Sequence, residues 1–319
     1  MNGNRGLYSH GARTLEFLPF ESGTTKSIDI PREAFLKRLV MRFSATAVVA
    51  GGANSGVVNE DAVLRLIDSI ELVGNGVADR VILDARGLYH MNTIMRGVAP
   101  AILNPADGNI GNKPINVLLE LNLANKFGVN PTDSILRTMD FTSLKLRVRW
   151  ANPNTMFGGA YDRTCTIANN FGIETIMYET LAIAPTTTRL MDYQELEYAA
   201  ATTQLEVDLP LQRMYQGVFI MATLDGVRSD ALINNITFKT AQTLRQWDRV
   251  PYVNIREELA AKSGLAALPT GCALALLTED GMITSGLNAY RTNTCKAIFD
   301  VNAPAGVKRI RVYSDSFLL

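Results

Sequence analysis

The sequence predicts a predominantly β chain in which one β-domain is built twice, in tandem. Three observations support this. Apolar and polar residues alternate with a period of two over many short segments, as in strands with one face in a core. Dipeptides typical of tight hairpins separate some of these segments. A series of three apolar segments also occurs twice, in the same order, which indicates an internal duplication.

The repeated series is a strand ending in Asp-x-Pro, a second apolar strand and a Leu-Ile-x-x-Ile block. The first copy occupies residues 28–31, 39–46 and 66–72, and the second copy residues 207–210, 218–223 and 232–238. The proline is tolerated because a strand end need not donate a ladder hydrogen bond. We therefore expect Ile70 and Ile236 to lie in equivalent strands, and the Asp-x-Pro segments to end equivalent first strands.

A helix follows each Leu-Ile-x-x-Ile strand. The first is expected from Asp84, a candidate N-cap, to Gly97, a C-terminal stop. The second is expected to begin at Asn254, with Glu257 three residues later at capping-box spacing, and to end at Gly264. One short helix in each domain is the prediction.

Each half then ends with two more strands. The alternation of residues 144–150 predicts the first of them, with Leu144, Leu146, Val148 and Trp150 on one face. Residues 295–301 are its counterpart in the second half. The last strands are expected within residues 172–183 and 306–317. In the early strand 39–46, Leu39, Met41, Phe43 and Ala45 line one face, and Val40, Arg42 and Ser44 the other.

Turns and length set the domain organisation. Asn75-Gly76 and Asp280-Gly281 predict tight hairpins. A chain of 319 residues with 47% hydrophobic content has room for two domains, at roughly 100 to 200 residues each. The predicted division is an N-terminal arm, a first domain, a linker and a second domain, at 1–14, 15–184, 185–202 and 203–319.

Charge and cysteine content narrow the class of protein. The 31 basic and 31 acidic side chains cancel, so the chain has no global basic field for gripping nucleic acid. Arg5 and Arg13 are expected in a solvated terminal segment. Cys165, Cys272 and Cys295 are expected to be buried free thiols. With no signal-peptide core and no apolar span of about 20 residues, we expect a soluble protein made in a reducing compartment.

No catalytic, cofactor or metal site is predicted. His10 and His90 are the only histidines, too few for a histidine metal cluster, and His90 is expected on a helix surface rather than as a general base. Glycine-rich residues 51–56 lack the Lys-Ser/Thr ending of a phosphate loop. Residues 74–76 are followed by Asp79 where a dinucleotide fingerprint has glycine. Both segments are interpreted as loops.

Carboxylates and a glycosylation sequon are interpreted in the same way. Glu174 and Glu179 have odd spacing along one strand and should face opposite sides, and Glu279-Asp280 should lie in a turn, so neither forms a glycosidase pair. Asn235-Ile236-Thr237 matches a sequon but lies inside a predicted strand. The protein is therefore predicted not to be an enzyme.

The duplicated pattern resembles a known family. Two tandem β-domains, each with a strand ending in Asp-x-Pro, and the strand 35–43 (Phe-Leu-Lys-Arg-Leu-Val-Met-Arg-Phe) resemble the double jelly-roll major capsid proteins of tailless icosahedral viruses. The tectivirus-like and corticovirus-like bacteriophages are the nearest comparison. Residues 130–133 in the first domain, and residues 225–230 and 306–313 in the second, also resemble segments of that family. The likeness extends from about Leu15 to Phe317.

This resemblance implies a fold and a function. Each domain would be an eight-stranded jelly-roll sandwich. Three chains would form a homotrimer, a pseudo-hexagonal capsomer that tiles an icosahedral virion shell. The implied partners are neighbouring capsomers, minor capsid or vertex proteins and the internal viral membrane that relatives often enclose. The implied location is the virion, after synthesis and assembly in the host cytoplasm.

Two other classes of function stay open at this point. A carbohydrate-binding, lectin-like pair of β-sandwiches would need exposed aromatic side chains. The chain has only Trp150, which shares an apolar face with Leu146 and Val148, and Trp247. A β-sandwich hydrolase is the other alternative. The mass of the purified protein separates them from a capsid protein, because a lectin or an enzyme can work as a monomer.

Overall fold

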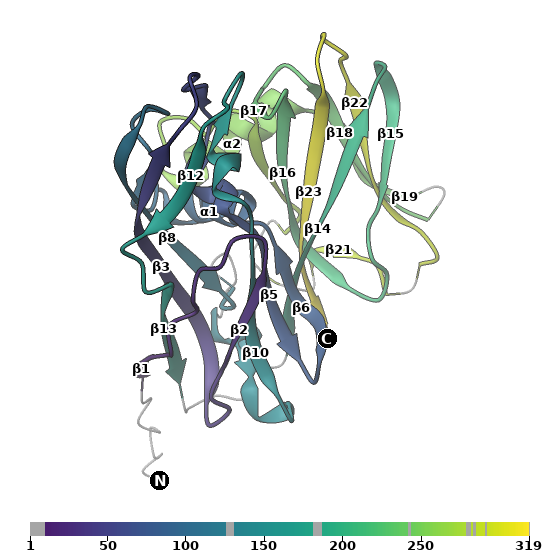
Figure 1. The fold of residues 1–319 in the computed structure, drawn as a ribbon. Helices are drawn as coiled ribbons and strands as arrows, with labels where there is room; N and C mark the ends of the chain where they lie inside the picture. Colours follow the sequence, from purple (N-terminus) through teal and green to yellow (C-terminus); the bar gives the residue numbers. More distant parts are fainter. Residues whose placement is uncertain are drawn as a thin grey trace. The chain divides into compact units, whose positions relative to one another are not determined.

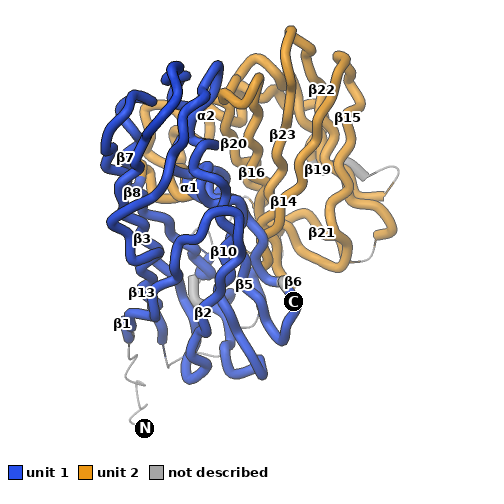
Figure 2. Tube along the Cα trace, viewed as in Figure 1, with its two compact units in different colours: residues 1–89, 100–126, 130–189 blue, residues 90–99, 127–129, 190–319 orange. Residues whose placement is uncertain are grey.

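Strands dominate both halves of the chain (Figure 1). The computed structural model describes residues 10–125, 131–180, 187–241, 244–278, 282, 285–290 and 292–318. These residues form two compact units (Figure 2). Unit 1 comprises the described residues within 1–89, 100–126 and 130–189, and unit 2 those within 90–99 and 190–319.

Unit 1 contains two antiparallel sheets. The strands of the first, in spatial order, are β1 (His10–Thr14), β13 (Ile173–Thr180), β3 (Phe35–Ala50), β8 (Gly111–Asn122) and β7 (Ile102–Leu103). Two further strands pair with β3: β9 (Leu136–Arg137) and β12 (Thr164–Ala168). The second sheet has the order β6 (Val77–Leu83), β5 (Ile67–Gly74), β10 (Leu144–Trp150) and β2 (Thr25–Asp29). A small ladder joins β4 (Val57–Val58) and β11 (Phe157–Gly158).

Unit 2 repeats this arrangement. Its first sheet has the order β14 (Thr188–Tyr198), β23 (Lys308–Leu318), β16 (Met214–Leu224) and β20 (Cys272–Leu276), with β17 (Val227–Arg228) and β21 (Leu287–Asn288) also paired to β16. Its second sheet has the order β15 (Thr202–Asp208), β22 (Cys295–Val301), β18 (Ile233–Thr240) and β19 (Leu244–Pro251).

The two units share one strand order. When the eight main strands of each unit are numbered along the chain, the first, eighth, third and sixth form one sheet. The second, seventh, fourth and fifth form the other. This is the connectivity of a jelly roll, with its two Greek keys. The predicted duplication is confirmed at the level of topology, and Ile70 and Ile236 both lie in the fourth strand of their unit.

The sequence pattern located the later strands well. The predicted strands 144–150 and 295–301 coincide with β10 and β22. The last strands, β13 and β23, lie close to the predicted segments. Asn75 and Gly76 both have positive φ (52° and 84°) and join β5 to β6, as expected of a tight hairpin. The predicted hairpin at Asp280-Gly281 lies outside the described residues.

The first strand of each unit was missed. Strand β1 begins within the predicted arm 1–14, and β14 occupies most of the predicted linker 185–202. The Asp-x-Pro segments therefore end the second strand of each unit, and the prediction that they end first strands was wrong. The cause is composition: β1 reads His-Gly-Ala-Arg-Thr, and the C-terminal half of β14 is rich in polar residues, so neither shows a clean apolar alternation. The domain boundaries themselves stay a prediction.

Both predicted helices are present. In α1 (Ala85–Arg96) the Asp84 carboxylate accepts a hydrogen bond from the backbone N–H of Gly87, at 3.1 Å, and Gly97 follows with φ of 69°. Helix α2 (Tyr252–Ser263) ends as expected at Gly264, which has φ of 74°. It begins two residues early, after Pro251, without a side-chain cap, so the predicted capping box at Asn254 and Glu257 was wrong.

Short 3-10 turns and two apolar cores complete the units. The turns are Ala62–Leu66, Pro131–Ser134, Thr138–Asp140 and Pro153–Met156. In unit 1 the predicted inner face of β3, from Leu39 to Ala45, is buried. The rings of Phe43 and Trp150 join its two sheets, with centroids 5.2 Å apart. In unit 2 inner residues of both sheets form one cluster that includes Val218, Ile236, Phe238 and Phe299. Among the described residues, no helix is long and apolar enough to span a membrane.

A matched pair of substitutions tests this division between core and surface. Phe299 is fully buried in the unit 2 core, whereas Phe171 is 82% exposed in unit 1. We expect Phe299→Ala to lower the free energy of unfolding by about 3 to 5 kcal/mol, because it removes a buried ring and leaves a cavity. Phe171→Ala should change it by less than about 0.5 kcal/mol. Urea denaturation followed by circular dichroism measures both, and equal effects would contradict the assigned core.

Candidate assembly surfaces

His90 does not lie where the sequence suggested. It is on α1 but only 3% exposed, and its Nδ1 is 3.4 Å from Arg228 Nη1. The prediction of a helix-surface histidine was wrong, because α1 is buried from Ala85 to Met95 and not on one face only. Among the described side chains, no group of three His, Cys, Asp or Glu residues is placed to hold a metal ion.

The two carboxylates on β13 lie on opposite sides, as their odd spacing predicts. The irregularity in the ladder between β13 and β3 is an extra residue on β3, so the alternation along β13 continues through Tyr178 and Glu179. Glu174 lies in the row of Arg42, whereas Glu179 lies opposite Gly11, on the side of the buried Met177. Glu179 accepts a 3.4 Å hydrogen bond from Arg13. The other predicted acids, Glu279 and Asp280, lie outside the described residues.

The glycine-rich segment and the sequon are structural. Residues 51–56 form a loop after β3 in which Gly51, Gly52 and Gly56 have positive φ, as interpreted from the sequence. The loop is held by the Asp162 carboxylate, which accepts hydrogen bonds from the backbone and side chain of Asn54. These hydrogen bonds help to lower the pKa of Asp162. Asn235 of the sequon lies within β18, as expected, and donates to Asp300 at 3.0 Å.

The remaining named side chains are also accounted for. All three cysteines are buried free thiols, as predicted. Trp150 is buried, and its Nε1 donates to the Pro19 carbonyl at 2.9 Å. Trp247 is half-buried and packs edge-on against Phe238. Neither tryptophan offers the exposed ring that a sugar-binding platform needs. Arg13 donates to Glu33 at 3.1 Å, and Arg5 lies outside the described residues.

The outer face of the first sheet of unit 1 mixes apolar and charged side chains. We call it the β3 face. Strand register aligns its side chains in rows across β13, β3 and β8, and the central row is Ile176, Val40 and Glu120. The next rows are Glu174, Arg42 and Leu118, then Tyr178, Arg38 and Asn122. The sequence predicted that Val40, Arg42 and Ser44 share one face of their strand, but it did not predict which residues of the adjacent strands lie beside them.

Polar contacts hold the side chains of the β3 face in place. The Arg38 guanidinium carbon lies 4.1 Å from the centre of the Tyr178 ring, and Arg38 Nη1 donates to Glu120 Oε1 at 3.3 Å. Arg42 Nε donates to Asn116 Oδ1 at 3.4 Å. Arginine and tyrosine are the residue types enriched at protein interfaces. The β3 face therefore has the composition of a contact surface.

The opposite outer face of unit 1 is different in kind. On β10, alternate side chains form ion pairs with neighbouring strands: Lys145 with Asp29, Arg147 with Glu71 and Arg149 with Asp68, at 3.7, 3.1 and 3.5 Å. The first and third pairs are exposed, whereas Arg147 and Glu71 are half-buried. Such pairs contribute little to stability but suit a surface that stays in water.

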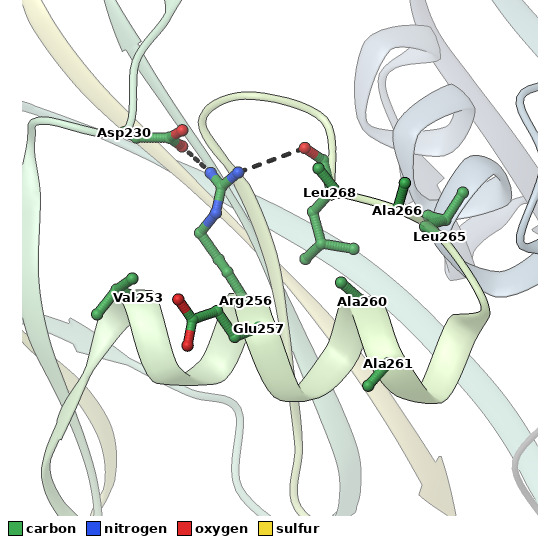
Figure 3. A pocket seen from close by; sticks show the side chains of 10 residues that line it. Asp230, Val253, Arg256, Glu257, Ala260, Ala261, Leu265, Ala266 and Leu268 are labelled. Carbon is green, nitrogen blue, oxygen red and sulfur yellow. Dashed lines mark hydrogen bonds and ion pairs between the residues drawn. The ribbon is translucent and has the colours of Figure 1, made fainter.

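A groove lies beside α2 in unit 2 (Figure 3). It has a volume of about 530 Å³ and is lined mainly by small apolar residues of α2 and of residues 265–268. Arg256 closes one side: it pairs with Asp230, and its Nη2 donates to the Leu268 carbonyl at 3.3 Å. Burial lowers the pKa of Arg256. Since Asp230 also accepts from the Gly271 N–H, the two charges serve to fasten the loop after α2.

An exposed aromatic pair marks a third surface. Phe17 is 51% exposed, Phe171 is 82% exposed, and their ring centroids are 6.0 Å apart. The backbones of Leu18 and Ile173 exchange two hydrogen bonds directly beside them. Gly172, with φ of 100°, allows this close approach, because a Cβ there would meet the Leu18 carbonyl oxygen at 2.0 Å. No sequence pattern distinguished these two rings from core residues.

Several solved structures share this architecture. The crystal structure of the STIV major capsid protein, from Sulfolobus turreted icosahedral virus, matches with a TM-score of 0.75 at 12% identity, over 98% of this chain and 97% of that chain. The fold is the double jelly roll. The major capsid protein P2 of bacteriophage PM2 matches with a TM-score of 0.67 at 11% identity, over 97% of both chains.

A third double jelly roll extends the comparison. The PBCV-1 virus capsid matches with a TM-score of 0.60 at 9% identity, over 99% of this chain and 95% of that chain. No protein-family model and no curated protein sequence matches this chain. The resemblance stated from the sequence is thus confirmed in fold, and it covers both jelly rolls.

The buried thiols give a test that follows from their pKa values. Burial raises the pKa of Cys165 to about 11 and that of Cys295 to about 12, from an ordinary value of 9.0. At pH 8 both should be neutral and react with a disulfide reagent at least about 100-fold more slowly than after denaturation, because the thiolate is the nucleophile. Above pH 9 the unfolded thiols ionise first, so stability should fall as pH rises. Rapid labelling of the folded protein at pH 8 would contradict this.

Proposed function

We propose that this chain is a major capsid protein that assembles with copies of itself into the shell of an icosahedral virion. One observation carries the proposal: both jelly rolls match, in tandem and over nearly the whole length of both chains, the capsid proteins of STIV and PM2. The likeness covers 98% of this chain for the STIV protein and 97% for the PM2 protein.

The assembly unit we propose is a homotrimer. A chain with two jelly rolls supplies six similar barrels to a three-fold ring, so the trimer has a nearly hexagonal outline and can tile a shell. Duplicated topology supports this, because units with one strand order present comparable outlines. Neighbouring capsomers and minor or vertex proteins would be the partners, with assembly in the host cytoplasm.

Structural function is favoured over the two alternatives. A lectin is disfavoured because Trp150 is buried and Trp247 is packed against Phe238. A hydrolase is disfavoured because Glu179 contacts Arg13 and His90 is buried beside Arg228. The double jelly roll serves a Sulfolobus virus, a bacteriophage and PBCV-1, so the bacteriophage host and the internal membrane stay predictions.

Light scattering on the purified protein tests the proposal. We expect a particle of about 105 kDa, three times the chain mass of 34.9 kDa, at micromolar concentration. Electron microscopy of the same sample at higher concentration should show hexagonal outlines. A stable monomer in both measurements would contradict the capsid function.

A further inference from the structure

The outward residues of two corresponding strands, β16 in unit 2 and β3 in unit 1, differ in burial. In unit 2, every residue of β16 from Met214 to Ala222 is buried, so both faces of this strand are covered. The outward row there is Leu274, Phe219 and Tyr313, all at most 3% exposed. In unit 1 the corresponding strand is β3, and its outward residues Arg42 and Ser44 are exposed.

Composition follows this difference in burial. The row Leu274, Phe219 and Tyr313 of unit 2 is apolar and aromatic, as expected of buried positions. Farther along the same side of that sheet, Arg309 and Arg311 of β23 pair with acidic residues of β14 and are partly exposed. The β3 face mixes Val40, Ile176 and Leu118 with arginine, glutamate and tyrosine. It must be soluble while the chain is alone and still be able to bind. Its arginines and its tyrosine, Arg38, Arg42 and Tyr178, are of the residue types enriched at interfaces.

The β3 face is also large enough to hold two chains together. Strand β8 has 12 residues, which at about 3.4 Å per residue spans about 40 Å. Three to four strands spaced about 4.8 Å apart give a width of about 14 to 19 Å. The resulting area of about 600 to 750 Å² per partner approaches the roughly 800 Å² of a stable interface.

From these three observations we infer that the β3 face is the surface by which one copy of this chain binds the next copy in the capsomer. The occupant is a second copy because the area of the β3 face approaches what a stable interface between two chains needs, while the corresponding strand of unit 2, β16, is already buried on both faces. The contact would be heterologous, as cyclic three-fold symmetry requires. This inference deepens the proposed function and rests on it. Arg38 and Tyr178, held together before binding, would be among its contacts.

Matched substitutions on the two outer faces of unit 1 test the inference. Ser44 is exposed on the β3 face, and Ser27 is exposed on β2 of the other sheet, opposite Arg147. We expect Ser44→Arg to weaken self-association at least about tenfold, as for a substitution at the centre of an interface. Ser27→Arg should associate like the unchanged chain. Sedimentation equilibrium measures association, and far-ultraviolet circular dichroism checks that both variants fold.

A second measurement does not require a substitution that weakens association. In Ser44→Cys, the introduced thiol should react with a maleimide at least about tenfold more slowly in the oligomer than in the diluted monomer. In Ser27→Cys the rate should be the same in both states. The three native thiols are buried, so background labelling is low.

The outcomes separate the two proposals. If the unchanged chain is monomeric at all concentrations, the proposed capsid function fails and this inference fails with it. If the unchanged chain forms oligomers but Ser44→Arg associates equally well and the Ser44→Cys thiol stays reactive, only the β3 face is overturned. Loss of association in Ser44→Arg alone, together with protection of the Ser44→Cys thiol, supports the inference.

Discussion

Each jelly roll depends on one constraint: a sheet with an apolar face must be covered along its whole length. Unit 1 meets it by closing two sheets on each other, and the contact of Phe43 with Trp150 lies at the centre of that closure. Phe20 packs edge-on against Trp150 at 4.9 Å and fills the space beside them. Because the inner side chains of every strand must reach this core, the alternation of faces is fixed along the chain. The outer faces are free to vary.

That freedom is where the two units diverge. Their strand order is the same, yet the central strand β16 of unit 2 is buried on both faces, whereas its counterpart β3 in unit 1 has exposed outward residues. A fold repeated within one chain could in principle use either copy for any contact. A difference between the outer faces reduces this ambiguity, because the two units then present different side chains for association. The side chains available for association are thus those of the outer faces, which the packing of the core does not constrain.

The same division explains what could be predicted from the sequence. Strands β10 and β22 alternate strictly, because one face of each meets a core and the other meets water, and both were located to the residue. The ends of both helices were located by Gly97 and Gly264, whose positive φ is a local property. Strand β1 was missed because it is short and largely polar. The start of α2 was missed because Pro251, which has a fixed φ, precedes the predicted cap.

Errors at the candidate surfaces have a different origin. His90 was expected on a helix surface because helical periodicity records only the neighbours of one element, and α1 is covered on all sides. The assignment of Glu174 and Glu179 to opposite faces holds, because β13 itself has no inserted residue: the irregularity in its ladder is an extra residue on β3. The rows of the β3 face depend on which strands pair and in which register, and both are tertiary properties. A sequence pattern shows that Arg42 points outward, whereas only the fold shows that Leu118 and Glu174 lie beside it.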